Sequence, residues 1–98
     1  TIEHYEDFDD AKSKDEKDIE SLTKRELDVI SLISLGYSNK KIANTLYISE
    51  GTVKKHITNI LSKLNLKSRV DAIIFANKNS YLVQYAINKS YKTNMRKE

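Results

Sequence analysis

The chain has 98 residues, contains no cysteine and carries a net charge of +3 at pH 7. A chain of this length holds one small domain, and without cysteine it forms neither a disulfide framework nor a cysteine-based zinc site. Its apolar runs are far shorter than the roughly 20 residues that cross a bilayer, and its acidic start differs from a secretion signal. We therefore expect a small cytoplasmic domain without a membrane span. Because the first residue is Thr1 rather than methionine, we also expect further residues upstream.

The net charge hides an asymmetry along the chain. Residues 1–20 carry 9 acidic and 3 basic side chains, whereas residues 21–98 carry 5 acidic and 14 basic ones. A small basic domain attracts polyanions, of which nucleic acid is the usual one. The alternative at this point is a solvated basic surface without a partner.

The acidic segment, residues 1–20, has little apolar material beyond Ile2, Tyr5 and Phe8 in its first 18 residues. Such a segment cannot bury enough surface to offset the entropy lost on ordering. We therefore expect a disordered acidic tail or linker, with order beginning near residues 19–22.

A first helix is predicted from Thr23 to about Leu35. Thr23 and Glu26 have the spacing of a capping box, in which each side chain satisfies a free amide at the helix start. Apolar side chains then recur at steps of three and four, at Leu27, Val29, Ile30 and Ile33. Gly36 follows at the position where helices commonly end in a left-handed C-terminal cap.

Two further helices follow, separated only by a tight break after Leu46. Ser38 is the expected N-cap of a short helix that turns Ile42, Ala43 and Leu46 inward. Ser49 is the expected N-cap of the next helix, at about residues 50–64. Such a pair of helices is typical of a helix-turn-helix, which places its second helix in the major groove of DNA.

The second of these helices has two unlike faces. Its apolar face contains Val53, Ile57, Ile60, Leu61 and Leu64. Its polar face contains Lys54, Lys55, Thr58, Asn59 and Ser62, none of them acidic. We expect the polar face to meet DNA. The acidic groups from Glu3 to Glu20 are then expected to compete with DNA for the basic surface.

A fourth helix is predicted after Ser68, with Asp71 three residues beyond the cap. It is more apolar than a one-sided helix requires, at Val70, Ala72, Ile73, Ile74, Phe75 and Ala76. We expect part of that surface to meet a second copy of the domain. After Ser80, a fifth helix is predicted, with a short face made by Tyr81, Leu82, Tyr85 and Ala86.

Five segments together resemble the DNA-binding domain of LuxR/FixJ-type transcription regulators. They are LTKRE (22–26), GYSNKKIA (36–43), ISEGTVKKH (48–56), ILSKL (60–64) and SR (68–69). Their order and spacing hold over about residues 22–76, which makes the resemblance specific. It implies an all-α, compact four-helix domain at the C-terminal end of a two-domain regulator. Such a regulator is commonly a response regulator of a two-component system, controlled by phosphorylation of an N-terminal receiver domain that this chain lacks.

The resemblance also implies which residues read bases. Lys54, Lys55 and Thr58 occupy the matching positions, and Asn59 is adjacent. The chemistry fits, because lysine donates to guanine and threonine contacts a base edge or the thymine methyl group. The alternative for Lys54 and Lys55 is a pair of solvated surface lysines.

Contacts to the DNA backbone are expected from helix starts and flanking cations, because amides, hydroxyls and ammonium groups suit phosphate oxygen. The candidates are Ser38, Asn39, Lys40, Ser49, Thr52, Lys63, Lys67 and Arg69. Ser38, Ser49 and Thr52 also have a competing role as helix caps. Gly51 departs from the larger residue that the resemblance implies at this position. We expect the glycine to weaken the start of the helix slightly and to let DNA approach the backbone closely.

The resemblance further implies dimerisation on DNA through the fourth helix, with Val70, Ile73 and Ile74 as candidates, at least one of them a core residue. Partners are then double-stranded promoter or operator DNA, a second copy, the receiver domain and RNA polymerase. Three units follow: an acidic linker or tail (1–20), the DNA-binding domain (21–78) and a C-terminal extension (79–98).

Other functions remain as alternatives at this stage. A promoter-reading domain of a sigma factor uses a similar helix-turn-helix, and a protein-interaction module would dock an acidic partner on the basic face. A hydrolase is disfavoured, because no nucleophile, base and orienting group occur together. With only His4 and His56 and no cysteine, no metal site or cofactor is expected.

Overall fold

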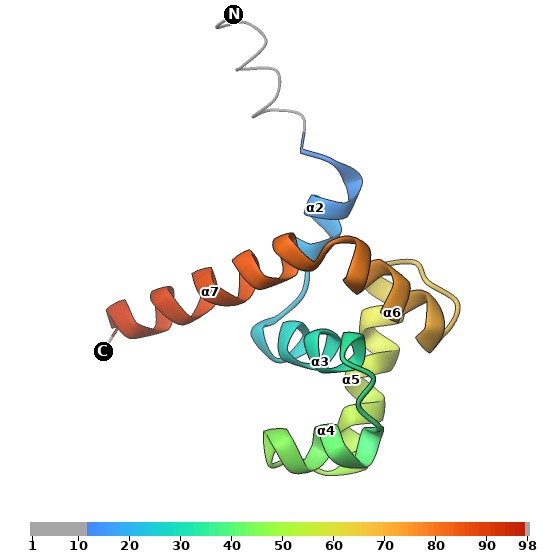
Figure 1. The fold of residues 1–98 in the computed structure, drawn as a ribbon. Helices are drawn as coiled ribbons and strands as arrows, with labels where there is room; N and C mark the ends of the chain where they lie inside the picture. The colour runs from blue at the N-terminus through green and yellow to red at the C-terminus, as the bar shows by residue number, and fades with distance from the viewer. Residues whose placement is uncertain (1–11, 98) are drawn as a thin grey trace, which may run out of the picture.

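A computed structural model of the protein describes the backbone of residues 12–97 and the side chains of residues 12–91. This part of the chain contains helices and no strand (Figure 1). The helices are α2 (Lys14–Glu20), α3 (Lys24–Ser34), α4 (Asn39–Leu46), α5 (Glu50–Lys63), α6 (Arg69–Lys78) and α7 (Ser80–Lys97). The all-helical fold predicted from the sequence is thereby confirmed, including the fifth helix expected after Ser80.

A serine or threonine precedes each of the helices α2 to α6. Each of these hydroxyl groups accepts a hydrogen bond from the amide three residues further along, which would otherwise lack a partner inside its helix. The N-caps are Ser13, Thr23, Ser38, Ser49 and Ser68. Thr23 and Glu26 form the predicted capping box, with donor–acceptor distances of 2.9 and 3.1 Å. The predicted left-handed conformation of Gly36 is also present, with φ of 84°.

The core lies where α3 packs against α5, α6 and α7. Val29, Ile30 and Ile33 of α3 are completely buried, as are Ile42 of α4 and Ile60 of α5. Burying one such side chain contributes about 1.5–3 kcal/mol relative to leaving it exposed. The apolar residues predicted to face inward from α3, α4 and α5 are thus confirmed. Through these residues α4 and α5 are held together at one end of the molecule (Figure 1).

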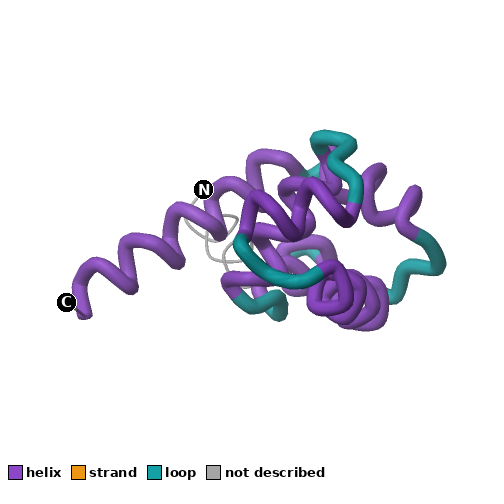
Figure 2. Tube along the Cα trace, turned by 90° about the horizontal axis from the view of Figure 1, so that it is seen from below, coloured by secondary structure: helices purple, strands orange, loops and turns teal. Residues whose placement is uncertain are grey.

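The other end of the molecule is formed by α2 and α7, which pack against each other; we call this pair the clasp. Ile19 of α2 is 2% exposed, and Val83 and Ile87 of α7 are also buried. The Asn79 side-chain amide, just before α7, donates to the Asp15 carboxylate at 3.0 Å. Beyond the clasp, α7 continues as a single helix away from the rest of the fold (Figures 1 and 2).

The start of the ordered chain was predicted too late. Order was expected to begin near residues 19–22, but α2 already begins at Lys14. Although α2 is highly charged, it contains one buried apolar residue, Ile19. The helix α7, against which α2 packs, lies more than 60 residues further along the chain. The expectation of a disordered tail therefore fails for residues 14–20, and for residues 1–11 it lies outside the described residues.

The buried face of α7 also differs from the prediction. Tyr81 and Tyr85 were expected on it, but they are 91% and 67% exposed. The core instead receives Val83 and Ile87, with Leu82 and Ala86 partly buried beside them. Shifting the face by one or two residues brings the aliphatic side chains to α3 and leaves the tyrosine hydroxyls in water.

Candidate nucleic-acid interface

The polar face of α5 is open to solvent. Lys54, Lys55, Thr58 and Asn59 are exposed, whereas Val53, Ile57 and Ile60 on the other side of the helix are buried. The Thr58 hydroxyl donates to the Lys54 carbonyl at 3.0 Å. Its oxygen can still accept a hydrogen bond, and its methyl group remains free. The four predicted base-reading residues thus lie on one exposed strip with two ammonium groups.

The starts of α4 and α5 display hydroxyl groups that cap their own helices. Ser38 accepts from the Lys41 amide at 3.1 Å, and Ser49 accepts from the Thr52 amide at 3.0 Å. The Ser49 and Thr52 hydroxyls also lie 2.9 Å apart, within hydrogen-bonding distance. The capping role considered for these hydroxyls is present, and it keeps them at positively polarised helix ends, where an anion is stabilised.

Arg69 connects α6 to the loop before α4. Its guanidinium group donates one hydrogen bond to the Asn39 side chain and one to the Tyr37 carbonyl. These partners lie about 30 residues away along the chain. Asn39 and Arg69 were both predicted to contact the DNA backbone. In the structure they bind each other and fix the start of α4. The sequence carried no signal for this contact.

Lys63 lies at the other end of α5, on the surface, and its ammonium group is engaged by two protein groups. Its ammonium group is 2.7 Å from Glu26 Oε1 and 3.2 Å from the Ser21 carbonyl. Glu26 is 3% exposed. Burial alone would raise the pKa of the Glu26 carboxyl, but hydrogen bonds from Lys63 and the Thr23 amide outweigh it and hold the pKa below its ordinary value. This ion pair joins α3 to α5 and was missed because its partners are 37 residues apart.

The other predicted residues lie on the surface. Lys40 and Lys67 are exposed, and the neighbouring Lys41 places its ammonium group 4.1 Å from the centre of the Tyr37 ring. On α6, Val70 and Ile74 are 61% and 59% exposed. Ile73 is partly buried and packs on the core, which confirms that one of the three dimer candidates is a core residue.

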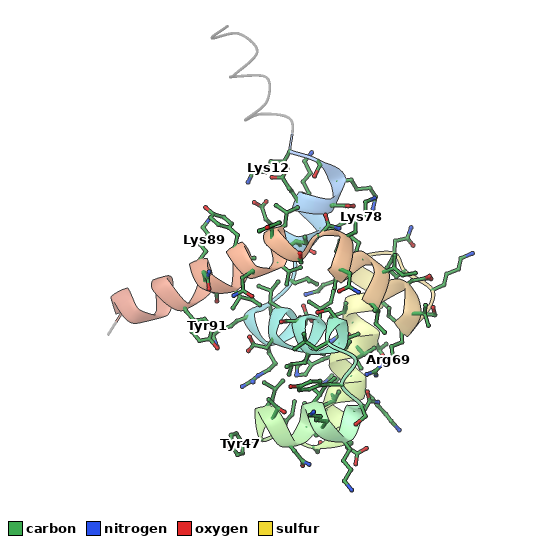
Figure 3. The ribbon with its side chains drawn as sticks, viewed as in Figure 1. Lys12, Tyr47, Arg69, Lys78, Lys89 and Tyr91 are labelled. Carbon is green, nitrogen blue, oxygen red and sulfur yellow. The ribbon has the colours of Figure 1, made fainter. Side chains whose placement is uncertain are left out.

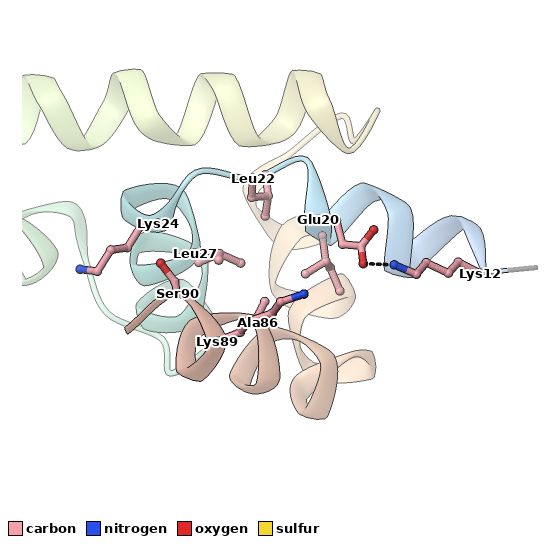
Figure 4. A pocket seen from close by; sticks show the side chains of 9 residues that line it. Lys12, Glu20, Leu22, Lys24, Leu27, Ala86, Lys89 and Ser90 are labelled. Atoms are coloured by element: carbon pink, nitrogen blue, oxygen red, sulfur yellow. Dashed lines mark hydrogen bonds and ion pairs between the residues drawn. The ribbon is translucent and has the colours of Figure 1, made fainter. Parts of the chain in front are cut away.

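An open hollow of about 470 Å³ lies between α2, α3 and α7, at the clasp (Figure 4). Lys12, Lys24 and Lys89 surround an apolar floor that includes Ile19 and Leu27. Lys12 is paired with Glu20, and Lys24 lies 4.4 Å from the centre of the Tyr91 ring. The cations at this hollow are therefore engaged by protein groups, as Lys12 and Lys24 show.

Among residues 12–97, no helix is long and apolar enough to span a membrane. Histidine, aspartate and glutamate side chains within the same residues form no cluster of three that could hold a metal ion.

Residues 20–76 match the family model of bacterial regulatory proteins of the luxR family. The transcriptional regulatory protein LiaR of Bacillus subtilis is 53% identical over 60 residues, covering 61% of this chain and 28% of LiaR. DegU of Brevibacillus brevis, also a transcriptional regulatory protein, is 46% identical over 66 residues, covering 67% of this chain and 28% of DegU. The response regulator protein VraR of Staphylococcus aureus is 49% identical over 57 residues, covering 58% of this chain and 27% of VraR. The chain thus spans about a quarter of the length of these relatives.

Proposed function

The chain belongs to the luxR family of bacterial regulatory proteins, and on that premise we propose that α5 reads the major groove of double-stranded DNA. Its function is sequence-specific DNA binding as part of a transcription regulator. The observation that carries the proposal is the exposed strip on α5, where Lys54, Lys55, Thr58 and Asn59 stand side by side without an acidic neighbour among them.

Base reading is assigned to this strip. The Lys54 and Lys55 ammonium groups suit the guanine acceptors O6 and N7, and the Thr58 methyl group suits the thymine methyl. Each good contact of this kind contributes about 1–3 kcal/mol of discrimination between bases. The exposure of all four side chains supports this assignment, because each can reach a groove without repacking.

Backbone contacts are assigned to both helix starts and to the exposed lysines. Ser38, Ser49 and Thr52 lie at helix N-termini, and Lys40 and Lys67 carry ammonium groups in solvent. Asn39 and Arg69 act indirectly, because their mutual hydrogen bond positions α4. Lys63 contributes least, since Glu26 already neutralises its charge.

Dimerisation on DNA is assigned to α6, through Val70 and Ile74. Both side chains are mostly exposed although both are apolar, whereas Ile73 between them supports the core. A small contact of this kind is weak in solution and gains from the duplex, which holds two copies close together. Each copy would then occupy one half-site of an operator with two-fold symmetry.

The whole protein is proposed to be a cytoplasmic response regulator without enzymatic chemistry in this domain. Residues 21–78 form the DNA-binding domain, residues 1–20 lead into it, and residues 79–98 extend it. A phosphorylated receiver domain upstream would control binding, and RNA polymerase would be the partner at the promoter. The names of the relatives VraR, a response regulator protein, and LiaR, a transcriptional regulatory protein, support this context.

Selection from a random duplex library tests the function. We expect an enriched motif with two-fold symmetry, and an affinity for it that falls steeply as salt rises, because phosphate contacts release counterions. An enriched single asymmetric site would favour a sigma-factor-like reader. Absence of any enrichment would contradict sequence-specific binding and favour a protein-docking module.

Two matched lysine variants test the reading face. Lys55→Ala should weaken binding to the selected site about 5- to 100-fold and leave binding to a scrambled duplex nearly unchanged, because a base contact contributes about 1–3 kcal/mol. Lys40→Ala should weaken both alike and reduce the salt slope by about 1. Equal effects of the two variants on both duplexes would show that the reading face is assigned wrongly.

A further inference from the structure

Tyr47 has an unusual backbone conformation for its residue type. It caps the C-terminal end of α4 in the left-handed region, with φ of 58° and ψ of 45°. The other described residues with positive φ are Gly36 and Asn65. Glycine has no Cβ to clash there and asparagine is tolerated, but a bulky side chain is disfavoured by its own backbone. Two of the three left-handed positions thus carry a suitable residue, and Tyr47 is the exception.

The fold does not require a tyrosine at this position. The Ile48 amide donates to the Ala43 carbonyl at 3.0 Å, which closes the end of α4. That hydrogen bond requires the left-handed backbone and not the phenol ring. The Tyr47 side chain is 94% exposed, the largest exposed fraction among the large apolar side chains described. Among the residues that the structure describes, none packs on the Tyr47 ring to compensate for the unfavourable conformation, which is the pattern expected of a residue that makes an external contact.

The position of Tyr47 indicates what that contact is. It stands two residues before Ser49, the N-cap of α5, so its Cα lies within about 7 Å of the start of that helix. Its ring points away from the body of the molecule at the α4 end (Figure 3). A phenol hydroxyl is an uncharged donor of a kind that contacts DNA phosphates.

We propose that Tyr47 binds the DNA backbone beside the groove entered by α5, with its hydroxyl donating to a phosphate oxygen. This inference rests on the proposed function and adds a neutral contact to the charged ones. The ring extends the surface of the helix-turn-helix past the end of α4. A neutral contact has a distinct signature, because it adds affinity without releasing a counterion.

Tyr47→Phe and Tyr47→Asn test the proposal, with Tyr81→Phe as the matched control. Tyr81 is 91% exposed but lies on α7, at the clasp end. We expect Tyr47→Phe to weaken binding to both selected and scrambled duplexes about 3- to 10-fold, as the loss of one net hydrogen bond does. Its salt slope should equal that of the unaltered chain. Tyr47→Asn should weaken binding at least as much, while raising the midpoint of urea unfolding.

The outcomes separate this inference from the proposed function. Because a phosphate contact is independent of sequence, the scrambled duplex alone suffices if no motif is enriched. Affinities of both Tyr47 variants equal to that of the unaltered chain would overturn the contact, while motif enrichment by the unaltered chain would leave the proposed function standing. Unchanged affinity with a loss of transcription in a purified RNA polymerase assay would also overturn it, and would assign Tyr47 to a protein partner.

Discussion

The two ends of the molecule differ in what their exposed residues do. At the α4–α5 end, Lys40, Lys54, Lys55 and Tyr47 project into solvent, while the serine hydroxyls there cap their own helices. At the clasp, charged and polar groups are paired within the protein, as in Lys12 with Glu20 and Asn79 with Asp15. The first end lies within the family match, residues 20–76, whereas α7 and nearly all of α2 lie outside it.

The two ends therefore have different roles in our proposal. The residues within the family match carry the surface proposed to meet DNA, and the flanking helices α2 and α7 complete the core beside α3. For the same reason we no longer expect the acidic groups of residues 14–20 to compete with DNA, while competition by residues 3–11 stays a prediction. Residues 14–20 are held by α7 at the end away from α4, and residues 1–11 lie outside the described chain.

The largest effect is expected from Ile42→Ala at the DNA-binding end. Ile42 is completely buried and holds α4 on the core. Removing a buried isoleucine side chain costs about 2–5 kcal/mol of unfolding free energy. Urea unfolding followed by circular dichroism measures it, and DNA affinity should fall too because α4 positions α5. A loss below about 1 kcal/mol would show that α4 is only loosely packed.

Glu26→Gln should have the next largest effect, because it removes the buried carboxylate that pairs with Lys63 and joins α3 to α5. We expect a loss of about 1–3 kcal/mol near pH 7. Glu20→Gln removes the exposed partner of Lys12 and serves as the control. Its unfolding midpoint should match that of the unaltered chain.

The same variant tests a pH dependence. The pKa of Glu26 is lower in the folded chain than its ordinary value of 4.5. The carboxylate therefore stabilises the fold above that value, and this contribution is lost as the pH falls through the lowered folded pKa. Urea midpoints measured from pH 7 to pH 3 should decline less steeply for Glu26→Gln. Parallel curves would assign the acid sensitivity to other carboxylates.

Ile19→Ala should break the clasp and spare the DNA-binding end. Ile19 is the single buried residue of the seven-residue helix α2. A helix so short does not persist alone in water, so the loss is limited to the free energy of docking α2, about 1–2 kcal/mol. Hydrogen exchange should show faster exchange in α2 and unchanged protection in α4 and α5. A drop in DNA affinity would show that the two ends are coupled.

Gly51→Ala should have the smallest effect. An added Cβ would meet only the Ser49 Oγ, at 3.8 Å, which is an ordinary contact. Alanine is more favourable than glycine in a helix, and near a helix start we expect a gain of about 0.5 kcal/mol. Weaker DNA binding by this more stable variant would support close approach of DNA at Gly51. Unchanged binding would remove that role.

The sequence by itself determined the helices from α3 to α6 and the strip on α5. Capping needs a hydroxyl and an amide three residues apart, and a helix face needs apolar side chains at steps of three and four. Both patterns are local, so Thr23 with Glu26, or Val53 with Ile57, could be recognised without knowledge of the rest of the chain.

Only the tertiary structure decided the contacts between distant segments. Glu26 pairs with Lys63, Arg69 binds Asn39 and the Tyr37 carbonyl, and Ile19 finds its partner in α7. The tertiary structure also decided which residues of α7 are buried. These are Val83 and Ile87, whereas the tyrosines expected on that face are exposed. Local patterns specify helices, but partners separated by 30 residues or more are selected by how the helices pack together.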